Sequence, residues 1–307
     1  MPGVSIIGSG NVGANTAFFI AEKGTHHVTL YDVREGLSTG KALDMMEAAP
    51  VRQYRPKLRG SDSIEAIAGS DVVVLAAGAV RKPGMKREDL FNENLALVRE
   101  VAPTVARLAP KAIVIIATEP VDPITTLFVR ESKMPRNQVI GLGGILDSTR
   151  LRYGIAHELR VSMDNVQAMV IGRHSDEMIM LSGYTNVSGI PIEQLLTQEA
   201  IEKLVNETRS AGDLIVQMSQ RSNAYYAPSA AAAELADAIH TDIHRIFSVS
   251  VMLAGEYGIH DVALSLPAII GREGVVRVMT PKLSREQEQQ LLRSAEEVNM
   301  LLSGRTR

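Results

Sequence analysis

Short apolar runs alternate with longer amphipathic segments from the start of the chain to about residue 140. Runs rich in β-branched residues and bordered by turn residues predict buried strands over Val4–Ile7, Val28–Tyr31, Val72–Ala76 and Ala112–Ala117. Helical periodicity lies between and after them, over Val12–Lys23, Gly40–Ala48, Leu90–Leu108 and Pro123–Glu131. Such strand–helix alternation predicts a parallel sheet with right-handed crossovers.

The second half of the chain has a mixed pattern, which predicts an α+β unit. Its predicted helices are Asp147–Leu159, Glu199–Gln220, Ala227–Ile239 and Ser284–Leu302. Its predicted strands are Val166–Ile171, Ile246–Ala254 and Val262–Ile269, the last two joined by a turn around Tyr257 and Gly258. No internal repeat or low-complexity linker separates the two halves, so we expect a packed boundary near Gly141–Gly144.

Composition narrows the class of protein. The 307 residues are 45% hydrophobic and 22% charged, which is the balance of a globular protein with a sizeable core. The absence of cysteine excludes disulfides, thiol nucleophiles and Cys-ligated metals. A net charge of −3 argues against binding to nucleic acid or to an acidic membrane surface. The chain enters an apolar strand without a signal segment and contains no membrane-length apolar run, so we expect a cytoplasmic protein.

A glycine-rich motif, Gly8-Ser9-Gly10-Asn11-Val12-Gly13, follows the first predicted strand and opens the first predicted helix. In such a motif the first glycine permits a tight turn and the second lets the backbone approach a pyrophosphate. The third lets helix and strand pack closely, and the helix N-terminus attracts the phosphates. Alone, the motif is a weak signal, because an ordinary strand–helix turn can also be rich in glycine.

Asp32 strengthens the prediction of a dinucleotide site. It ends the second predicted strand, about 20 residues beyond the last glycine of the motif. A carboxylate there accepts hydrogen bonds from the adenosine ribose and repels a 2′-phosphate, which favours NAD over NADP. Arg34 is the nearby residue that argues against this preference. The predicted cofactor-binding residues here are Gly8, Gly10, Asn11, Val12, Gly13 and Asp32.

A basic segment, Arg81-Lys82-Pro83-Gly84-Met85-Lys86-Arg87, follows the predicted strand Val72–Ala76. It therefore leaves the carboxyl edge of the sheet, where ligands bind in open α/β folds. In isolation this segment would be a solvated charged loop. Beside a dinucleotide site, it predicts a lid that closes over an anion and excludes water.

His174, Asp147 and Arg150 form a third group of candidate residues. His174 follows a predicted strand, and the other two lie at the start of a predicted helix. A histidine oriented by a carboxylate is a general acid–base unit near neutral pH, and a guanidinium suits two-pronged binding of a carboxylate. By itself His174 would be an ordinary polar residue at a strand end. The other histidines have no comparable context and lack the clustering of a metal site, so we predict no metal.

Taken together, these motifs resemble the lactate/malate dehydrogenase family in order and spacing, over essentially the whole chain. The resemblance rests on the glycine motif, Asp32, the Arg81–Arg87 segment, Leu146-Asp147-Ser148-Thr149-Arg150 and Gly172-Arg173-His174-Ser175-Asp176. Arg81 is typical of the malate type, since lactate enzymes carry glutamine there. Gly40-Lys41-Ala42-Leu43-Asp44 and Ala224-Tyr225-Tyr226-Ala227-Pro228 also look like bacterial malate dehydrogenases of the lactate-dehydrogenase-like type.

The resemblance implies an α/β fold, with a Rossmann doubly wound parallel sheet at 1–143 that binds NAD and an α+β substrate-binding and catalytic domain at 144–307. It implies that His174 exchanges the hydroxyl proton of malate and that Asp147 orients its imidazole. Arg150 would bind the C1 carboxylate, Arg81 the distal carboxylate, and Arg87 would polarise the reacting oxygen. Asn94 and the Ala117-Thr118-Glu119 segment would line the nicotinamide ribose, with Glu119 also next to the substrate.

The sequence departs from the family near the expected reaction centre. Glu119 stands where the family has asparagine, just before a proline whose peptide bond is usually cis. Two like charges about 4 Å apart cost roughly 4 kcal/mol at an intermediate dielectric, so a carboxylate there opposes a dianionic substrate. Arg173, Ser175 and Asn223 are further departures. We hypothesise that Glu119 and Arg173 compensate each other as an ion pair; independent drift of the two is the alternative.

Three functions follow from this pattern. The first is an NAD-dependent malate dehydrogenase acting on a small dicarboxylate. The second is a reductase of another 2-oxo acid with a pocket re-tuned by Glu119 and Asn223. The third is a weakly active NAD-binding member with a regulatory role, against which the joint retention of the catalytic and arginine residues argues. The family also implies assembly through helices at Leu37–Ala48, Asp147–Leu159 and Ala211–Gln220, as a homodimer or homotetramer.

Overall fold

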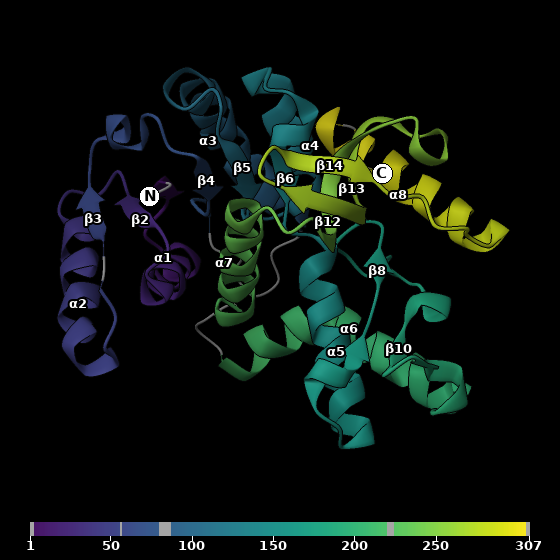
Figure 1. Cartoon of the computed structure of the whole chain (residues 1–307). Coiled ribbons are helices and arrows are strands. Elements are labelled where there is room, and N and C mark those ends of the chain that lie inside the picture. The colour runs from purple at the N-terminus through teal and green to yellow at the C-terminus, as the bar shows by residue number, and fades with distance from the viewer. Residues whose placement is uncertain (1–2, 56, 80–86, 220–223, 305–307) are drawn as a thin grey trace.

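The computed structural model describes residues 3–55, 57–79, 87–219 and 224–304 (Figure 1). In these ranges the largest sheet has nine strands, in the order β14-β13-β12-β6-β5-β4-β1-β2-β3. Two smaller sheets, of three and two strands, lie in the second half of the chain.

Six parallel strands form the part of the large sheet that the first half of the chain contributes. They are β1 (Gly3–Ile7), β2 (His27–Tyr31), β3 (Leu58–Ser61), β4 (Val72–Leu75), β5 (Ile113–Ile116) and β6 (Val139–Gly141). Their order, β3-β2-β1-β4-β5-β6, is that of the Rossmann fold. The predicted doubly wound sheet is confirmed. β3 and β6 were not predicted, because one contains Arg, Gly and Ser and the other has only three residues.

Helices cover both faces of these parallel strands (Figure 1). The helices of this part are α1 (Asn11–Lys23), α2 (Leu37–Arg52), α3 (Arg87–Leu108), α4 (Val121–Ser132) and α7 (Tyr226–Thr241). Successive strand residues point to opposite faces. Ile6 accordingly packs into a core with α1 and α7, whereas Ile7 packs into a second core with α3 and α4.

Three antiparallel strands extend the sheet beyond β6. They are β12 (Arg245–Ala254), β13 (His260–Gly271) and β14 (Gly274–Val278). β12 pairs antiparallel with β6 at Ser250 and Gly141. The sheet thus continues past residue 143, and the division of the chain into 1–143 and 144–307 stays a prediction.

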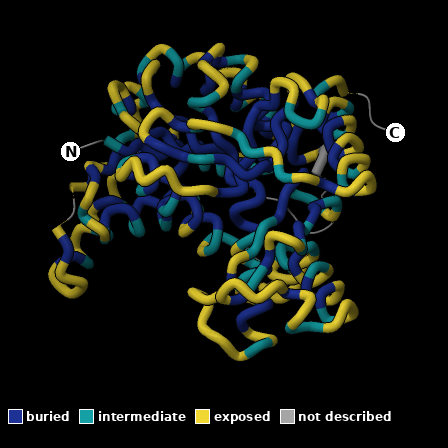
Figure 2. Tube along the Cα trace, turned by 45° about the vertical axis from the view of Figure 1, so that its right-hand side comes forward, coloured by how far each residue is buried: buried dark blue, intermediate teal, exposed yellow. Residues whose placement is uncertain are grey.

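A smaller lobe lies beside the sheet (Figure 2). It contains α5 (Gly144–Leu159), α6 (Gln198–Ser219), β7 (Val166–Gln167), β8 (Val170–Ile171), β9 (Ile179–Met180), β10 (Asn186–Val187) and β11 (Ile190–Pro191). The single strand predicted over Val166–Ile171 is wrong, because β7 pairs with β10 and β8 with β9. Between them the Met169 N–H donates to the Thr185 hydroxyl (3.5 Å), which takes the backbone out of a continuous ladder.

The last helix, α8 (Arg285–Leu302), is close to its predicted bounds. Ser284 begins it with a capping box, in which the Ser284 hydroxyl accepts from the Gln287 N–H and the Gln287 side chain accepts from the Ser284 N–H. α8 contacts α4 and β13 and so lies over the antiparallel end of the sheet. None of the described helices is long and apolar enough to cross a membrane.

Candidate active site

A cavity of about 280 Å³ lies next to the carboxyl ends of β1, β4 and β5, where open α/β sheets bind their ligands. Residues from both halves of the chain line it. The lining residues that matter most for chemistry are Gly10, Ala117, Glu119, Asp147, Arg150 and His174. The structure therefore brings together the predicted cofactor loop and the predicted acid–base residues.

The glycine motif has the geometry that a dinucleotide requires. Gly8 has φ +104°, and a Cβ there would lie 2.5 Å from the backbone nitrogen of Ala77. A Cβ on Gly13 would lie 1.8 Å from the carbonyl oxygen of Gly8. Gly10 has no atom within 4 Å of such a Cβ and lines the cavity, so its bare backbone is open to a ligand. Asn11 and Val12, the first residues of α1, line the same cavity.

Asp32, the predicted ribose contact, follows the last residue of β2 and touches the glycine motif. Its carboxylate is buried and accepts from the Ser9 N–H (2.8 Å) inside the glycine motif. The Arg34 N–H and Nε–H also donate to it, each at 3.1 Å. Burial acts to raise the pKa of Asp32, but the hydrogen bonds from Arg34 and Ser9 outweigh burial and hold that pKa below its ordinary value. The loop and Asp32 together fit a dinucleotide.

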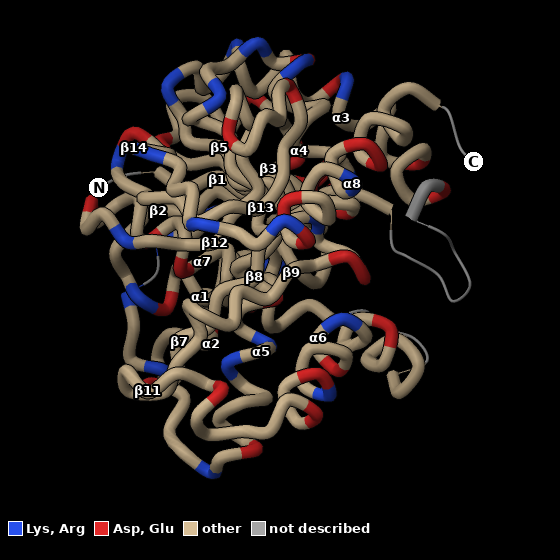
Figure 3. The backbone as a smooth tube through the Cα atoms, turned by 90° about the vertical axis from the view of Figure 1, so that its right-hand side faces the viewer, with Lys and Arg blue, Asp and Glu red and all other residues tan. Residues whose placement is uncertain are grey.

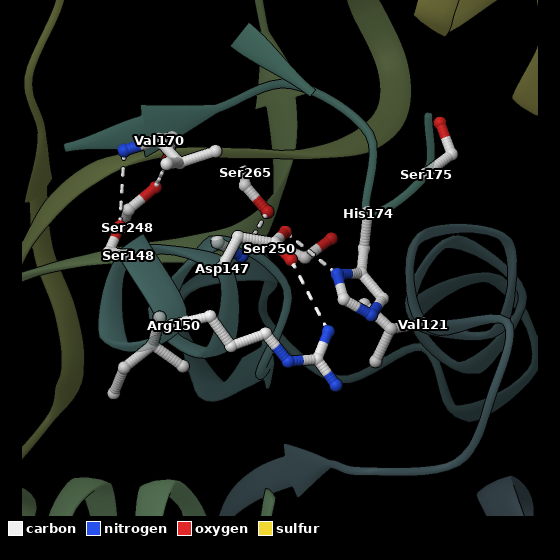
Figure 4. Close-up of polar contacts among 12 residues, drawn as sticks. Val121, Asp147, Ser148, Arg150, Val170, His174, Ser175, Ser248, Ser250 and Ser265 are labelled. Carbon is white, nitrogen blue, oxygen red and sulfur yellow. Dashed lines mark hydrogen bonds and ion pairs between the residues drawn. The ribbon is translucent and has the colours of Figure 1, made fainter. Parts of the chain in front are cut away.

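The structure places His174 and Asp147 in direct contact. The loop after β8 carries His174, and the first turn of α5 carries Asp147; His174 Nδ1 lies 2.7 Å from Asp147 Oδ2 (Figure 4). The His174 side chain is 14% exposed, and its Nε2 faces the cavity residue Glu119. Burial lowers the pKa of His174, but Asp147 and Glu119 outweigh it and raise that pKa to about 9.

Arg150 lies one helical turn beyond Asp147 and extends beneath the imidazole (Figure 4). Its Nη1 is 3.9 Å from Asp147 Oδ1, and its side chain is 15% exposed. Because it also lines the cavity, its guanidinium can form two parallel hydrogen bonds to a carboxylate there. Positions of Lys, Arg, Asp and Glu are interspersed along the backbone tube in Figure 3.

Asp122 holds the backbone of His174, and Ser250 holds Asp122; neither residue was predicted from the sequence. The fully buried Asp122 accepts from the His174 N–H (2.8 Å) and from the Ser250 hydroxyl (2.6 Å). Burial raises the pKa of Asp122 to about 6, against the lowering effect of these hydrogen bonds. The signal was present: a carboxylate three residues after Glu119 and a serine within the apolar strand β12 are both buried polar residues that need partners.

Ser265 on β13 joins the two segments that carry the acid–base pair. Its hydroxyl accepts from the Gly144 N–H (2.9 Å) at the start of α5, close to Asp147. Its backbone exchanges two hydrogen bonds with Gly172, two residues before His174. Figure 4 shows Ser250 and Ser265 on the Asp147 side of the pair. The antiparallel strands therefore serve as a rigid support for the site.

The hypothesised ion pair between Glu119 and Arg173 is wrong. Arg173 pairs with Glu297 of α8 instead. Glu119 Oε1 lies 3.4 Å from His174 Nε2, so the two departures from the family have different partners. The Glu119–Pro120 peptide bond is cis, as the resemblance implied.

Asn94, which was predicted to line the nicotinamide ribose, is buried and bonded to two loops. Its Oδ1 accepts from the Ala79 N–H (2.7 Å), and its Nδ2 donates to the Glu119 carbonyl (2.7 Å). Thr118 donates its hydroxyl proton to the Ala77 carbonyl (2.7 Å) and lines the cavity beside Ala117. Asn94 thus holds the two loops in place, and its contact with the nicotinamide ribose stays a prediction.

Several predicted residues lie outside what the structure describes. Arg81 and the rest of 80–86 are outside the described residues, as is Asn223. Arg87 is the first residue of α3.

Arg209 of α6 lines the cavity and was not predicted. Within the described ranges no group of three or more His, Asp or Glu residues could hold a metal ion.

Comparison with known proteins agrees with this geometry. Residues 3–141 match the family model described as lactate/malate dehydrogenase, NAD binding domain. Residues 145–302 match the model described as lactate/malate dehydrogenase, alpha/beta C-terminal domain. These matches place the chain among the NAD-dependent oxidoreductases.

Individual relatives cover nearly the full length. A malate dehydrogenase of Thermomicrobium roseum is 43% identical over 299 residues, which is 97% of this chain and 96% of the relative. The solved malate dehydrogenase of Salinibacter ruber is 36% identical, with a TM-score of 0.93 over 98% of this chain and 96% of that one. A Cryptosporidium parvum lactate dehydrogenase, complexed with lactic acid and its cofactor, is 32% identical, with a TM-score of 0.94 over 99% of this chain and 97% of that one. The chain belongs to the lactate/malate dehydrogenase family.

Proposed function

We propose that the protein is an NAD-dependent malate dehydrogenase that interconverts malate and oxaloacetate. The observation that carries the proposal is the buried His174–Asp147 pair, 2.7 Å apart, beside Arg150 and the glycine loop in one cavity. The relatives with about 40% identity over nearly the whole chain carry the name malate dehydrogenase.

This reaction assigns a role to each of the predicted catalytic and substrate-binding residues. His174 Nε2 takes the hydroxyl proton of malate and returns it to the oxygen of oxaloacetate, while Asp147 fixes the imidazole tautomer and stabilises the imidazolium. Arg150 binds the C1 carboxylate. Arg81 binds the distal carboxylate, and Arg87 polarises the C2 oxygen. Cations held in a water-poor cavity stabilise developing charge far better than they would in water.

We propose NAD(H) as the cofactor. The chemistry that this cofactor would supply, when bound, is hydride transfer: from C2 of malate to NAD, or from NADH to C2 of oxaloacetate. Gly10, Asn11 and Val12 would hold the pyrophosphate, and Asp32 the adenosine ribose. Ala117 and Thr118 would line the nicotinamide ribose, on a wall that Asn94 keeps in place.

Replacing Asp32 by serine is expected to move the cofactor preference towards NADPH. The change removes the carboxylate that repels a 2′-phosphate and leaves Arg34, whose side chain is 67% exposed, able to bind that phosphate. Loss of a charge-assisted hydrogen bond costs on the order of 1.5–3 kcal/mol, so KM for NADH should rise roughly tenfold or more. Measured KM values for NADH and NADPH check this. An unchanged ratio would show that Asp32 does not contact the ribose.

Replacing Arg81 by glutamine tests the assignment of a dicarboxylate substrate. It should remove one charge-assisted contact to the distal carboxylate, on the order of 1.5–3 kcal/mol, and leave the C1 contact in place. The ratio of kcat/KM for oxaloacetate to that for pyruvate is therefore expected to fall at least roughly tenfold. If the preference for oxaloacetate persisted in the variant, the substrate assignment would be wrong.

One observation favours a second candidate, a reductase of another 2-oxo acid. Glu119 places a carboxylate 3.4 Å from the reacting nitrogen, where it opposes a dianionic substrate more strongly than a monoanionic one. We retain malate as the first choice because the relatives with about 40% identity over nearly the whole chain are named malate dehydrogenase. A panel of 2-oxo acids separates the two.

We also propose a division of the chain into two domains and an oligomeric state. Residues 1–143 would bind the cofactor, and residues 144–307 would bind the substrate. The protein would form a homodimer or homotetramer, in keeping with its family. Large apolar side chains exposed on α2 and α6 support this, notably Val51 (83% exposed) and Met218 (78%).

A further inference from the structure

Glu119 is held in place from two sides. Its Oε2 accepts a hydrogen bond from the Val121 N–H (3.3 Å) at the start of α4, where the helix dipole favours a negative charge. Its backbone carbonyl accepts from the buried amide of Asn94 (2.7 Å). The remaining oxygen, Oε1, lies 3.4 Å from His174 Nε2. The carboxylate is thus fixed against the imidazole, although the side chain is 45% exposed.

The imidazole of His174 therefore lies between two carboxylates. Asp147 faces its Nδ1, and Glu119 faces its Nε2. Other charged groups near it are Arg150 of α5, Asp122 of α4 and Arg173 beside it in the chain. Arg209 and Asp213 of α6 line the same cavity. Burial alone would favour the neutral imidazole, so the flanking carboxylates decide its charge.

We propose that Glu119 is a positioning residue that holds the imidazole of His174 in its protonated form before substrate binds. When substrate binds, its C2 oxygen replaces the Glu119 carboxylate as the partner of Nε2–H. This inference rests on the proposed function for the identity of the substrate. The family has an uncharged asparagine at this position, so the contact between a carboxylate and His174 Nε2 comes from the glutamate of this chain.

The position of Glu119 has two consequences for substrate. The C2 oxygen of a 2-oxo acid must reach the nitrogen that Glu119 Oε1 faces, so the carboxylate and the substrate compete for one place. Reduction requires a proton on Nε2, and oxidation requires its lone pair. By favouring the proton, Glu119 extends reduction to higher pH and delays the onset of oxidation as pH rises.

The first test compares the wild type with Glu119→Gln over a range of pH. Glutamine keeps the shape of the side chain and an acceptor for the Val121 N–H, but removes the charge. Wild-type kcat/KM for oxaloacetate is expected to hold up to the raised pKa of about 9 and to fall above it. In the variant the fall should begin at least about one pH unit lower, because an opposite charge at this distance shifts a pKa by about 1–3. KM for oxaloacetate at neutral pH should drop about two- to fivefold, since a half-exposed like charge has been removed.

Glu131→Gln is the matched control. Glu131 lies at the other end of α4 and has a side chain 35% exposed, and the substitution changes charge in the same way. Its pH profile and KM should match those of the wild type. Identical profiles for Glu119→Gln and the wild type would overturn the inference.

A second readout does not depend on turnover. Nitrogen-15 NMR of the substrate-free protein follows the His174 imidazole, which is assigned as the signal missing from His174→Asn. The midpoint of the pH titration of this signal is expected near pH 9 in the wild type and at a lower pH in Glu119→Gln. A wild-type midpoint at or below about 6.5, the value of an isolated histidine, overturns the inference without any variant. If the titration shifts as expected but no 2-oxo acid is turned over, the inference about Glu119 stands and the proposed function fails.

Discussion

His174→Asn is expected to lower kcat for oxaloacetate reduction by roughly a thousandfold, because it removes the group that donates the proton to the substrate oxygen. General acid–base catalysis contributes about 10²–10⁴-fold, and the buried pairing with Asp147 at 2.7 Å makes His174 the candidate for all of it. Asparagine cannot exchange a proton near neutral pH but keeps a polar group near Asp147. Binding of NADH, measured by fluorescence, should change little, since the glycine loop and Asp32 do not contact the imidazole.

His157→Asn is the control for this substitution. His157 lies near the end of α5, stacked on the exposed Tyr153, and does not line the cavity. It should retain wild-type turnover. A His174→Asn enzyme with more than about a tenth of wild-type kcat would show that the proton comes from another group.

Arg150→Gln is expected to have the second-largest effect, a rise in KM for oxaloacetate of roughly a hundredfold. The guanidinium is 15% exposed and lines the cavity, so its bonds to a substrate carboxylate form away from bulk water. Truncating one partner of such a charge pair costs about 2–5 kcal/mol. Steady-state kinetics at saturating NADH measure this, and kcat should fall less than kcat/KM.

Arg152→Gln tests whether the loss of any arginine on α5 has the same effect. Arg152 donates to the carbonyls of Val166 and Met163, away from the cavity, so its loss should lower thermal stability slightly and leave KM unchanged. An equal rise in KM in both variants would mean that Arg150 acts through the stability of α5 and not through a substrate contact.

The parts of the fold and site that follow local rules could be predicted from the sequence. Gly8 and Gly13 are required because any Cβ there would collide with backbone, and such constraints leave a motif with fixed spacing. The strands β1, β4 and β5 are short runs of β-branched residues, and they lie within a residue or two of their predicted bounds. The contact of His174 with Asp147 followed from the resemblance, since 27 residues of chain separate the pair.

What the sequence did not reveal depends on contacts between distant segments. β14 and β6 are strands only because neighbours in the sheet pair with them, and their residues alone carry a weak pattern. Asp122 supports His174 from 52 residues away, and Ser250 supports Asp122 from 128 residues away. The partner of Arg173 could not be chosen either, because Glu297 lies 124 residues along the chain on α8.

Oxidation of NADH by the wild-type protein, measured with oxaloacetate and with pyruvate in parallel, decides whether this is a malate dehydrogenase. We expect rapid turnover with oxaloacetate and a kcat/KM at least roughly tenfold lower with pyruvate, which lacks the carboxylate that Arg81 would bind. Equal or faster turnover of pyruvate, or turnover of neither, would contradict the assignment as a malate dehydrogenase.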